Sequence, residues 1–120
     1  MDEDAPAVLR ISHRRAGPAH VIEVAGEIDA GTAPELRREL AQEKVDTTAA
    51  RLVVVDLSEV GFIDSAGLTI LAGLHRRGRE RGVSVKVVTR QYAVKRALNI
   101  TGLDELIPVV ADLAEALPAE

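Results

Sequence analysis

Asp64 and Ser65 stand side by side in the stretch FIDSAGL, residues 62–68, between two apolar runs. A carboxylate next to a hydroxyl is typical of three kinds of site. It can be a helix cap, part of a serine hydrolase, or a hydroxyl that another protein modifies. The remaining residues have to distinguish between these three.

A serine hydrolase needs a histidine within hydrogen-bond reach of its nucleophile. His75 comes ten residues later on the same predicted helix, about 15 Å along its axis, which is too far from Ser65. His13 and His20 fall in a predicted hairpin, and the sequence alone leaves their distance from Ser65 open. The Gly-x-Ser-x-Gly nucleophile motif is also absent, because residues 63–67 read Ile-Asp-Ser-Ala-Gly. We therefore expect a protein that is not an enzyme.

Metal, cofactor and nucleic-acid sites are disfavoured by composition. The chain has no cysteine and three scattered histidines, so we expect no metal site and no cofactor. The net charge is −4, and aromatic residues make up 2% of the chain, which is unlike a nucleic-acid-binding protein. The one basic run, residues 75–81, suits the negative end of a helix dipole, with a partner-facing patch as the alternative.

The same composition bears on where the protein acts. The absence of cysteine fits a reducing compartment, and no apolar run approaches the roughly 18 residues that span a bilayer. The N-terminal residues MDEDAPAV lack the basic and apolar regions of a signal peptide. We expect a cytoplasmic protein without a membrane part.

The hydrophobic pattern of the 120 residues predicts one α/β domain with an aliphatic core. Segments 7–13 and 19–25 flank the turn signal Gly17-Pro18 and predict a hairpin. Thr32, followed three residues later by Glu35, predicts a capping box for a helix over about 33–45.

The second half of the chain alternates strands and helices. Residues 51–57 have an unbroken β-branched apolar centre, which predicts a central strand covered on both faces. A connection at residues 58–61 is expected to follow it. The later elements are a helix at about 66–81, a strand at 83–88, a helix at 92–99 closed by Gly102, an edge strand at 106–110 containing Pro108, and a last helix capped by Asp112. The order ββαβαβαβα predicts a mixed, mainly parallel sheet with an N-terminal antiparallel hairpin and helices packed on it.

FIDSAGL thus lies where a strand gives way to a helix, and local physics favours a cap. Either Asp64 or Ser65 can cap the helix, and if Asp64 does so, Ser65 becomes the first helical residue and its hydroxyl is free. Gly67 either lets another molecule approach the backbone or lets the helix pack tightly.

Three segments together resemble the STAS domain, a family named for sulfate transporters and anti-sigma factor antagonists. They are VVVDLSEVGFIDSAGL (residues 53–68), Gly26-Glu27-Ile28-Asp29, and VKRALNITGLDELIPV (residues 94–109). The resemblance covers roughly residues 8–113, and we expect a single STAS-like domain over 1–120. The antagonist branch of the family is similar in that its members are a lone short domain.

The resemblance implies a phosphorylation switch. It places the phosphoacceptor at Ser65, with Asp64, Asp29 and Asp56 shaping its surroundings. Ala66 replaces a second serine that many members have, and Gly67 completes the motif. The implied partners are an anti-sigma factor with serine kinase activity, which the unphosphorylated domain binds so that a sigma factor is freed, and a serine phosphatase.

Two other functions and the oligomeric state stay open at this stage. One is a STAS scaffold or an accessory subunit of a transporter that works without phosphorylation, and the other is a small serine hydrolase. The chain is expected to be a monomer or a weak dimer, with no direct binding to nucleic acid or membrane.

Overall fold

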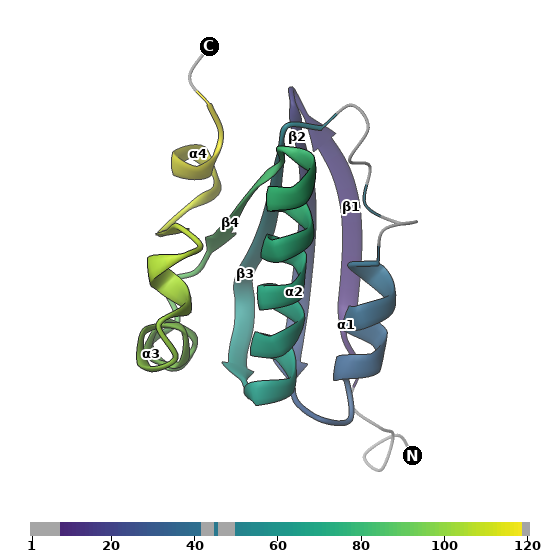
Figure 1. The fold of residues 1–120 in the computed structure, drawn as a ribbon. Helices are drawn as coiled ribbons and strands as arrows, with labels where there is room; N and C mark the ends of the chain where they lie inside the picture. Colours follow the sequence, from purple (N-terminus) through teal and green to yellow (C-terminus); the bar gives the residue numbers. More distant parts are fainter. Residues whose placement is uncertain (1–7, 42–44, 46–49, 119–120) are drawn as a thin grey trace.

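The computed structural model of the protein describes residues 8–41, 45 and 50–118 and arranges them around a five-stranded sheet (Figure 1). The strands are β1 (Arg10–Ala16), β2 (Ala19–Ile28), β3 (Leu52–Ile63), β4 (Ser84–Val88) and β5 (Val109–Val110). The helices are α1 (Ala33–Glu39), α2 (Ser65–Arg81), α3 (Tyr92–Ile100) and α4 (Leu113–Ala116), and a short 3-10 helix, η1, spans Leu103–Glu105. The predicted order ββαβαβαβα is confirmed, with η1 added after α3.

The sheet has the strand order β1-β2-β3-β4-β5. β1 and β2 are antiparallel, and every other neighbouring pair is parallel, which confirms the mixed, mainly parallel sheet. The hairpin turns at Gly17, whose φ of +60° is a left-handed conformation that glycine adopts without steric cost. β1 runs from Arg10 to Ala16, so it begins and ends three residues later than the predicted segment 7–13.

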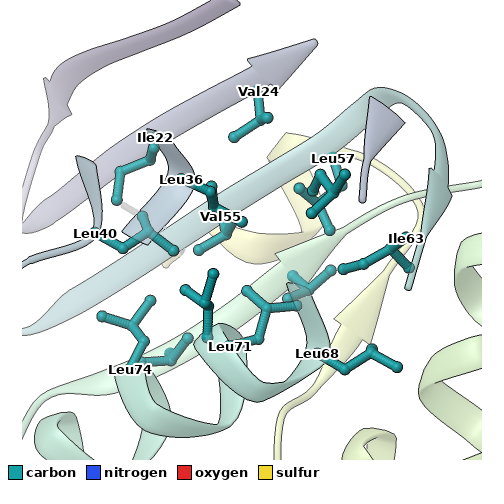
Figure 2. Close-up of a cluster of buried hydrophobic side chains, with 14 of the residues drawn as sticks. Ile22, Val24, Leu36, Leu40, Val55, Leu57, Ile63, Leu68, Leu71 and Leu74 are labelled. Carbon is teal, nitrogen blue, oxygen red and sulfur yellow. The ribbon is translucent and has the colours of Figure 1, made fainter. Parts of the chain in front are cut away.

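One face of the sheet packs against α1, α2 and α3 (Figures 1 and 2). The side chains labelled in Figure 2 belong to this cluster: Ile22, Val24, Leu36, Leu40, Val55, Leu57, Ile63, Leu68, Leu71 and Leu74. Phe62 and Tyr92 do not belong to it, because they are 45% and 74% exposed. The core is therefore aliphatic, as the composition predicts.

The opposite face of the sheet carries a smaller apolar cluster beneath α4. Val54 of β3 and Val88 of β4 belong to this cluster, whereas the next residue of β3, Val55, belongs to the larger one. The central strand is therefore covered on both faces, as its unbroken apolar run predicts. α4 begins at the predicted cap, where Asp112 Oδ1 accepts a 3.1 Å hydrogen bond from the Glu115 amide.

The predicted connection at residues 58–61 is wrong, because β3 continues through it to Ile63. β2 also continues beyond the predicted segment 19–25, as far as Ile28, which pairs with Ile63. Two register shifts in the β2–β3 ladder keep the strands paired past Gly26. Each strand supplies hydrogen-bond partners to a segment about 35 residues away, and this pairing outweighs the local turn signals.

The predicted capping box between Thr32 and Glu35 is also wrong. Thr32 does precede α1, but its side chain makes no capping hydrogen bond. Its hydroxyl instead donates to the Glu27 carbonyl at 2.8 Å and accepts from the Asp29 amide at 3.0 Å. α1 ends at Glu39 rather than near residue 45, and residues 42–44 of the predicted helix lie outside the described residues.

β5 is shorter than the predicted strand at 106–110. The amides of Leu106 and Ile107 both donate to the carbonyl of Leu103, at 3.0 and 2.9 Å, so these residues continue η1 instead of pairing with β4. Pro108 has no N–H to donate, and regular pairing begins only at Val109. The predicted edge position is confirmed, since β5 ends the strand order.

Candidate functional site

The junction between β3 and α2 has the predicted cap. Asp64 is extended, and its Oδ1 accepts hydrogen bonds from the amides of Ala66 and Gly67 at 3.0 and 3.4 Å. These are two of the amides that a helix start leaves without intrahelical partners. Asp64 therefore caps α2, and Ser65 is the first helical residue.

Ser65 is exposed, and its hydroxyl has no hydrogen-bond partner in the described part of the chain. Its carbonyl accepts a bond from the Thr69 hydroxyl at 2.9 Å, one turn further along α2. The side chain borders an open hollow of about 260 Å³, which is also lined by Leu68, Thr101 and Leu103. The hydroxyl is thus available to another protein at the rim of a shallow surface depression.

Gly67 decides how closely α2 approaches the sheet. A Cβ at this position would lie 2.5 Å from Ile28 Cγ2 and 2.7 Å from Ile63 Cγ1. Real Cβ atoms essentially never show such separations, so a larger residue would push the first turn of α2 away from β2 and β3. Of the two interpretations of Gly67, the structure therefore supports tight helix packing.

Asp29 and Asp64 occupy equivalent places at the carboxyl ends of two strands. Each directly follows one of two neighbouring parallel strands, and the Asp64 amide donates to the Ile28 carbonyl at 3.0 Å. Asp29 Oδ1 accepts bonds from the amides of Gly31 and Thr32 at 2.9 and 3.1 Å, so it holds the turn between β2 and α1. The structure therefore brings Asp29 to the same end of the sheet as the β3–α2 junction.

Asp56 lies apart from Asp29, Asp64 and Ser65. Its Oδ1 accepts hydrogen bonds from the amide and the hydroxyl of Ser58, two residues along the same strand. It lines a separate hollow together with Arg10 and Glu23. A role for Asp56 beside Ser65 has no contact in the described structure to support it.

The histidines lie far from Ser65, which answers the question that the sequence left open. His20 pairs with Val53, which precedes Ile63 by ten residues, or about 33 Å along an extended strand. His13 Nδ1 lies 2.8 Å from His20 Nε2, and His13 Nε2 lies 2.8 Å from Glu39 Oε1, so both rings belong to a network at the far end of β2. A histidine base for Ser65 is absent, since all three histidines of the sequence are described.

Phe62 is a surface feature that the sequence analysis missed. It lies in β3 three residues before Ser65 and is 45% exposed, whereas the adjacent Ile63 is buried. Val60 and Ile63 both belong to the larger buried cluster, so alternation counted from Val60 would have placed Phe62 inside as well. The register shift between Val60 and Phe62 breaks the alternation and leaves Phe62 on the surface.

The described part of the chain contains neither a cluster of metal ligands nor a membrane-spanning helix. Among the described residues, no group of three or more His, Asp or Glu side chains is placed to hold a metal ion. Within the same residues, no helix combines the length and apolarity needed to cross a bilayer.

Comparison with known proteins places this arrangement in a family. The family model described as the STAS domain matches residues 10–116. The chain belongs to the STAS domain family. This confirms the resemblance drawn from residues 53–68, and with it the expected fold.

Individual relatives of this STAS domain are named as antagonists. The anti-sigma-F factor antagonist RsfA of Mycobacterium tuberculosis is 33% identical over 111 residues, covering 92% of this chain and 87% of its own length. RsfB from the same organism, also an anti-sigma-F factor antagonist, is 36% identical over 115 residues, covering 94% and 90%. The crystal structure of an anti-sigma factor antagonist from Mycobacterium paratuberculosis superimposes with a TM-score of 0.79 at 34% identity, covering 90% of each chain.

Proposed function

We propose that this STAS domain is an anti-sigma factor antagonist whose partner binding is switched by phosphorylation of Ser65. In the unphosphorylated form it binds an anti-sigma factor with serine kinase activity and so frees a sigma factor for transcription. A serine phosphatase resets the switch. The domain itself acts by binding, not catalysis, and works in the cytoplasm, where sigma factors direct transcription.

The observation that carries the proposal is the exposed Ser65 hydroxyl at the first position of α2. A kinase needs a hydroxyl that it can reach, and this one is free of hydrogen bonds within the described structure. Relatives of 33% and 36% identity that bear the name antagonist support the same function. The absence of any histidine near Ser65 argues against the hydrolase alternative.

The capping geometry explains how a phosphate would act here. It would bring a charge of about −1.5 to −2. The helix dipole favours such a charge by roughly 0.3–1 kcal/mol. Asp64 already occupies the amides of Ala66 and Gly67, so few unpaired donors remain for the phosphate. Repulsion from the Asp64 carboxylate at about 6 Å is on the order of 1 kcal/mol in water, which offsets the dipole.

Because the attraction of the helix dipole and the repulsion from Asp64 offset each other, we predict that phosphorylation changes the surface charge and leaves the fold unchanged. An exposed dianion at the rim of the hollow next to Ser65 would have to lose its water against a docked partner. Burying an unpaired charge at an interface is unfavourable, so the phosphorylated domain is released.

A capture experiment tests the proposal. Tagged wild type, Ser65→Ala and Ser65→Asp would be incubated in lysate with and without ATP, and the bound proteins identified by mass spectrometry. Ser65→Ala should hold an anti-sigma factor in the presence of ATP, and Ser65→Asp should bind it weakly. Ser12→Asp, the same type of substitution on exposed β1, should bind like wild type.

Mass spectrometry of the peptide containing residue 65 locates the phosphate. Ser65 should carry it in the wild type, and Thr69→Val should be phosphorylated normally although it removes the nearest hydroxyl. Equal binding of the partner by wild type, Ser65→Ala and Ser65→Asp would refute the switch. Phosphate on Thr69 instead would refute the assignment to Ser65.

A further inference from the structure

The basic run of α2 extends beyond what the helix dipole explains. Arg79 and Arg81 lie in the last turn, where cations face carbonyl groups that have no partner within the helix. Arg76 and Arg77 come earlier, and their head groups reach back toward Gly73, about 12 Å before the end of the helix. The dipole effect falls off within the last turn, so it does not account for these two arginines.

The head groups of Arg76 and Arg77 converge on one point of α2. A Cβ added at Gly73 would lie 3.3 Å from Arg77 Nη1 and 3.8 Å from Arg76 Nη2. Glycine is unfavourable inside a helix, but here it leaves room for both guanidinium groups to lean over the backbone. We call Arg76 and Arg77, with Gly73 beneath them, the arginine site.

Neither positive charge of the arginine site is neutralised. Within the described residues, Arg76 makes no hydrogen bond or ion pair, although Glu80 lies one turn further on. Arg77 Nη2 donates to the carbonyl of Leu40 in α1 at 3.0 Å. This bond holds the guanidinium in place and leaves Nη1 facing Gly73. Two like charges are thus held close together without an anion, which favours binding of one.

The arginine site lies on the same side of α2 as Ser65. Arg76 follows Ser65 by eleven residues, close to three helical turns, and both residues are exposed. Because the Arg76 head group reaches back to Gly73, it lies about 12 Å along the axis from Ser65. A protein interface of standard size covers about 800 Å² of each partner, a patch roughly 30 Å across. A protein centred on Ser65 therefore also covers the arginine site.

We propose that the arginine site binds a carboxylate of the anti-sigma factor that docks on Ser65. The inference rests on the proposed function and adds a second point of contact to it. Covering two guanidinium groups removes their water, which is unfavourable unless the partner supplies an anion. A carboxylate matches the geometry of guanidinium donors, and here it accepts hydrogen bonds from Arg76 Nη2 and Arg77 Nη1.

A polyanion fits this side of α2 less well than a single carboxylate. Asp64 caps the same helix next to Ser65, and the whole chain has a net charge of −4. Nucleic acid or an anionic lipid surface laid along α2 would meet these negative charges as well as the arginines. One carboxylate on a protein surface reaches the arginine site alone.

The test uses the anti-sigma factor captured by Ser65→Ala, with further substitutions made in the Ser65→Ala chain. Calorimetric titration should show at least tenfold weaker binding for Arg76→Gln, and binding should weaken as sodium chloride is added. Arg76→Gln is not expected to disturb folding, because the side chain is exposed and has no partner in the described structure. Arg77→Lys keeps the charge but loses the planar donor pair, so it should also weaken binding.

Arg79→Gln is the matched control, since it removes the same charge from the same helix. Arg79 follows Ser65 by fourteen residues, about 21 Å along the axis, and lines a different hollow beside β4. Its substitution should change the affinity less than twofold. Arg76→Glu should lose binding further, and a lysine in place of one carboxylate of the partner should restore it.

Phosphorylation of the chain with an intact Ser65 gives a second readout. Arg76→Gln should raise the KM of the anti-sigma factor kinase for this domain and leave kcat within twofold. The reason is that the Arg76 head group holds the partner about 12 Å away from the reacting hydroxyl.

The possible results separate this inference from the proposed function. If Ser65→Ala holds its partner and Arg76→Gln leaves the affinity unchanged, the arginine site is refuted and the switch stands. If Ser65→Ala holds no anti-sigma factor, both are refuted. Equal weakening by Arg76→Gln and Arg79→Gln would indicate only long-range attraction and would also refute the site. Saturable binding of inorganic phosphate, seen as shifted side-chain signals of Arg76, would assign the site to a free anion instead.

Discussion

Gly67 and Ile28 touch so closely that the first turn of α2 has no room for a side chain at position 67. A Cβ there would come within 2.5 Å of Ile28 Cγ2. The contact holds the start of α2, with Ser65, against the end of β2. The same glycine thus links the stability of the fold to the placement of the candidate phosphoacceptor.

Gly67→Ala is therefore expected to destabilise the protein by about 1–3 kcal/mol, because an added methyl group must displace packed isoleucines. Urea denaturation measures the change. Gly73→Ala is the matched control on the same helix, since its new Cβ would meet only the flexible ends of Arg77, at 3.3 Å, and Arg76, at 3.8 Å. It should stabilise by up to about 1 kcal/mol through helix propensity. Similar effects of both substitutions would contradict the packing argument.

Asp64→Ala is expected to cost about 0.5–2 kcal/mol of folding free energy, since it leaves the amides of Ala66 and Gly67 without their cap. Asp64→Asn should stay close to wild type, because asparagine caps equally well without the charge. Thermal or urea unfolding compares the two. A loss in Asp64→Asn as large as that in Asp64→Ala would show that charge, and not the hydrogen bonds, stabilises this helix start.

Ser65→Asp, or phosphorylated Ser65, should keep the fold of the unmodified protein. Asp64 already accepts the hydrogen bonds of the amides at the start of α2, so a new negative charge at residue 65 is not needed to cap the helix. Amide chemical shifts should change around residues 63–69 and stay constant in β1, β4 and α4. Shifts spread through the sheet would instead indicate that modification reorganises the domain.

Phe62→Ala is expected to weaken binding to the anti-sigma partner at least tenfold, because buried aromatic anchors dominate protein interfaces. Its effect on stability should be small, since the ring is 45% exposed. Tyr92→Ala, which removes the other exposed aromatic ring from α3, should bind like wild type. Calorimetric titration of the captured partner gives both affinities, and an unchanged affinity for Phe62→Ala would exclude this ring from the interface.

The local features of the site could be predicted from the sequence. Asp64 as cap and Ser65 as first helical residue follow from interactions between residues two or three apart. The order of strands and helices and the aliphatic core follow from hydrophobic periodicity, which is also local. Asp112 and Glu115 form their capping box for the same reason.

The two failures depend on partners outside the segment on which each prediction was made. Thr32 makes no cap because its hydroxyl instead donates a hydrogen bond to the carbonyl of Glu27 in β2. The segment 58–61 joined β3 because the end of β2 pairs with it. No pattern within either segment reports the presence of that partner.

The sequence by itself therefore determined the elements, the cap and the exposed serine at the helix start. Only the tertiary structure decided what surrounds them: it set Gly67 on Ile28, placed Asp56 in a separate hollow and exposed Phe62. Gly67 and Ile28 lie far apart in the chain, and backbone pairing and packing density bring such residues together only when the sheet assembles.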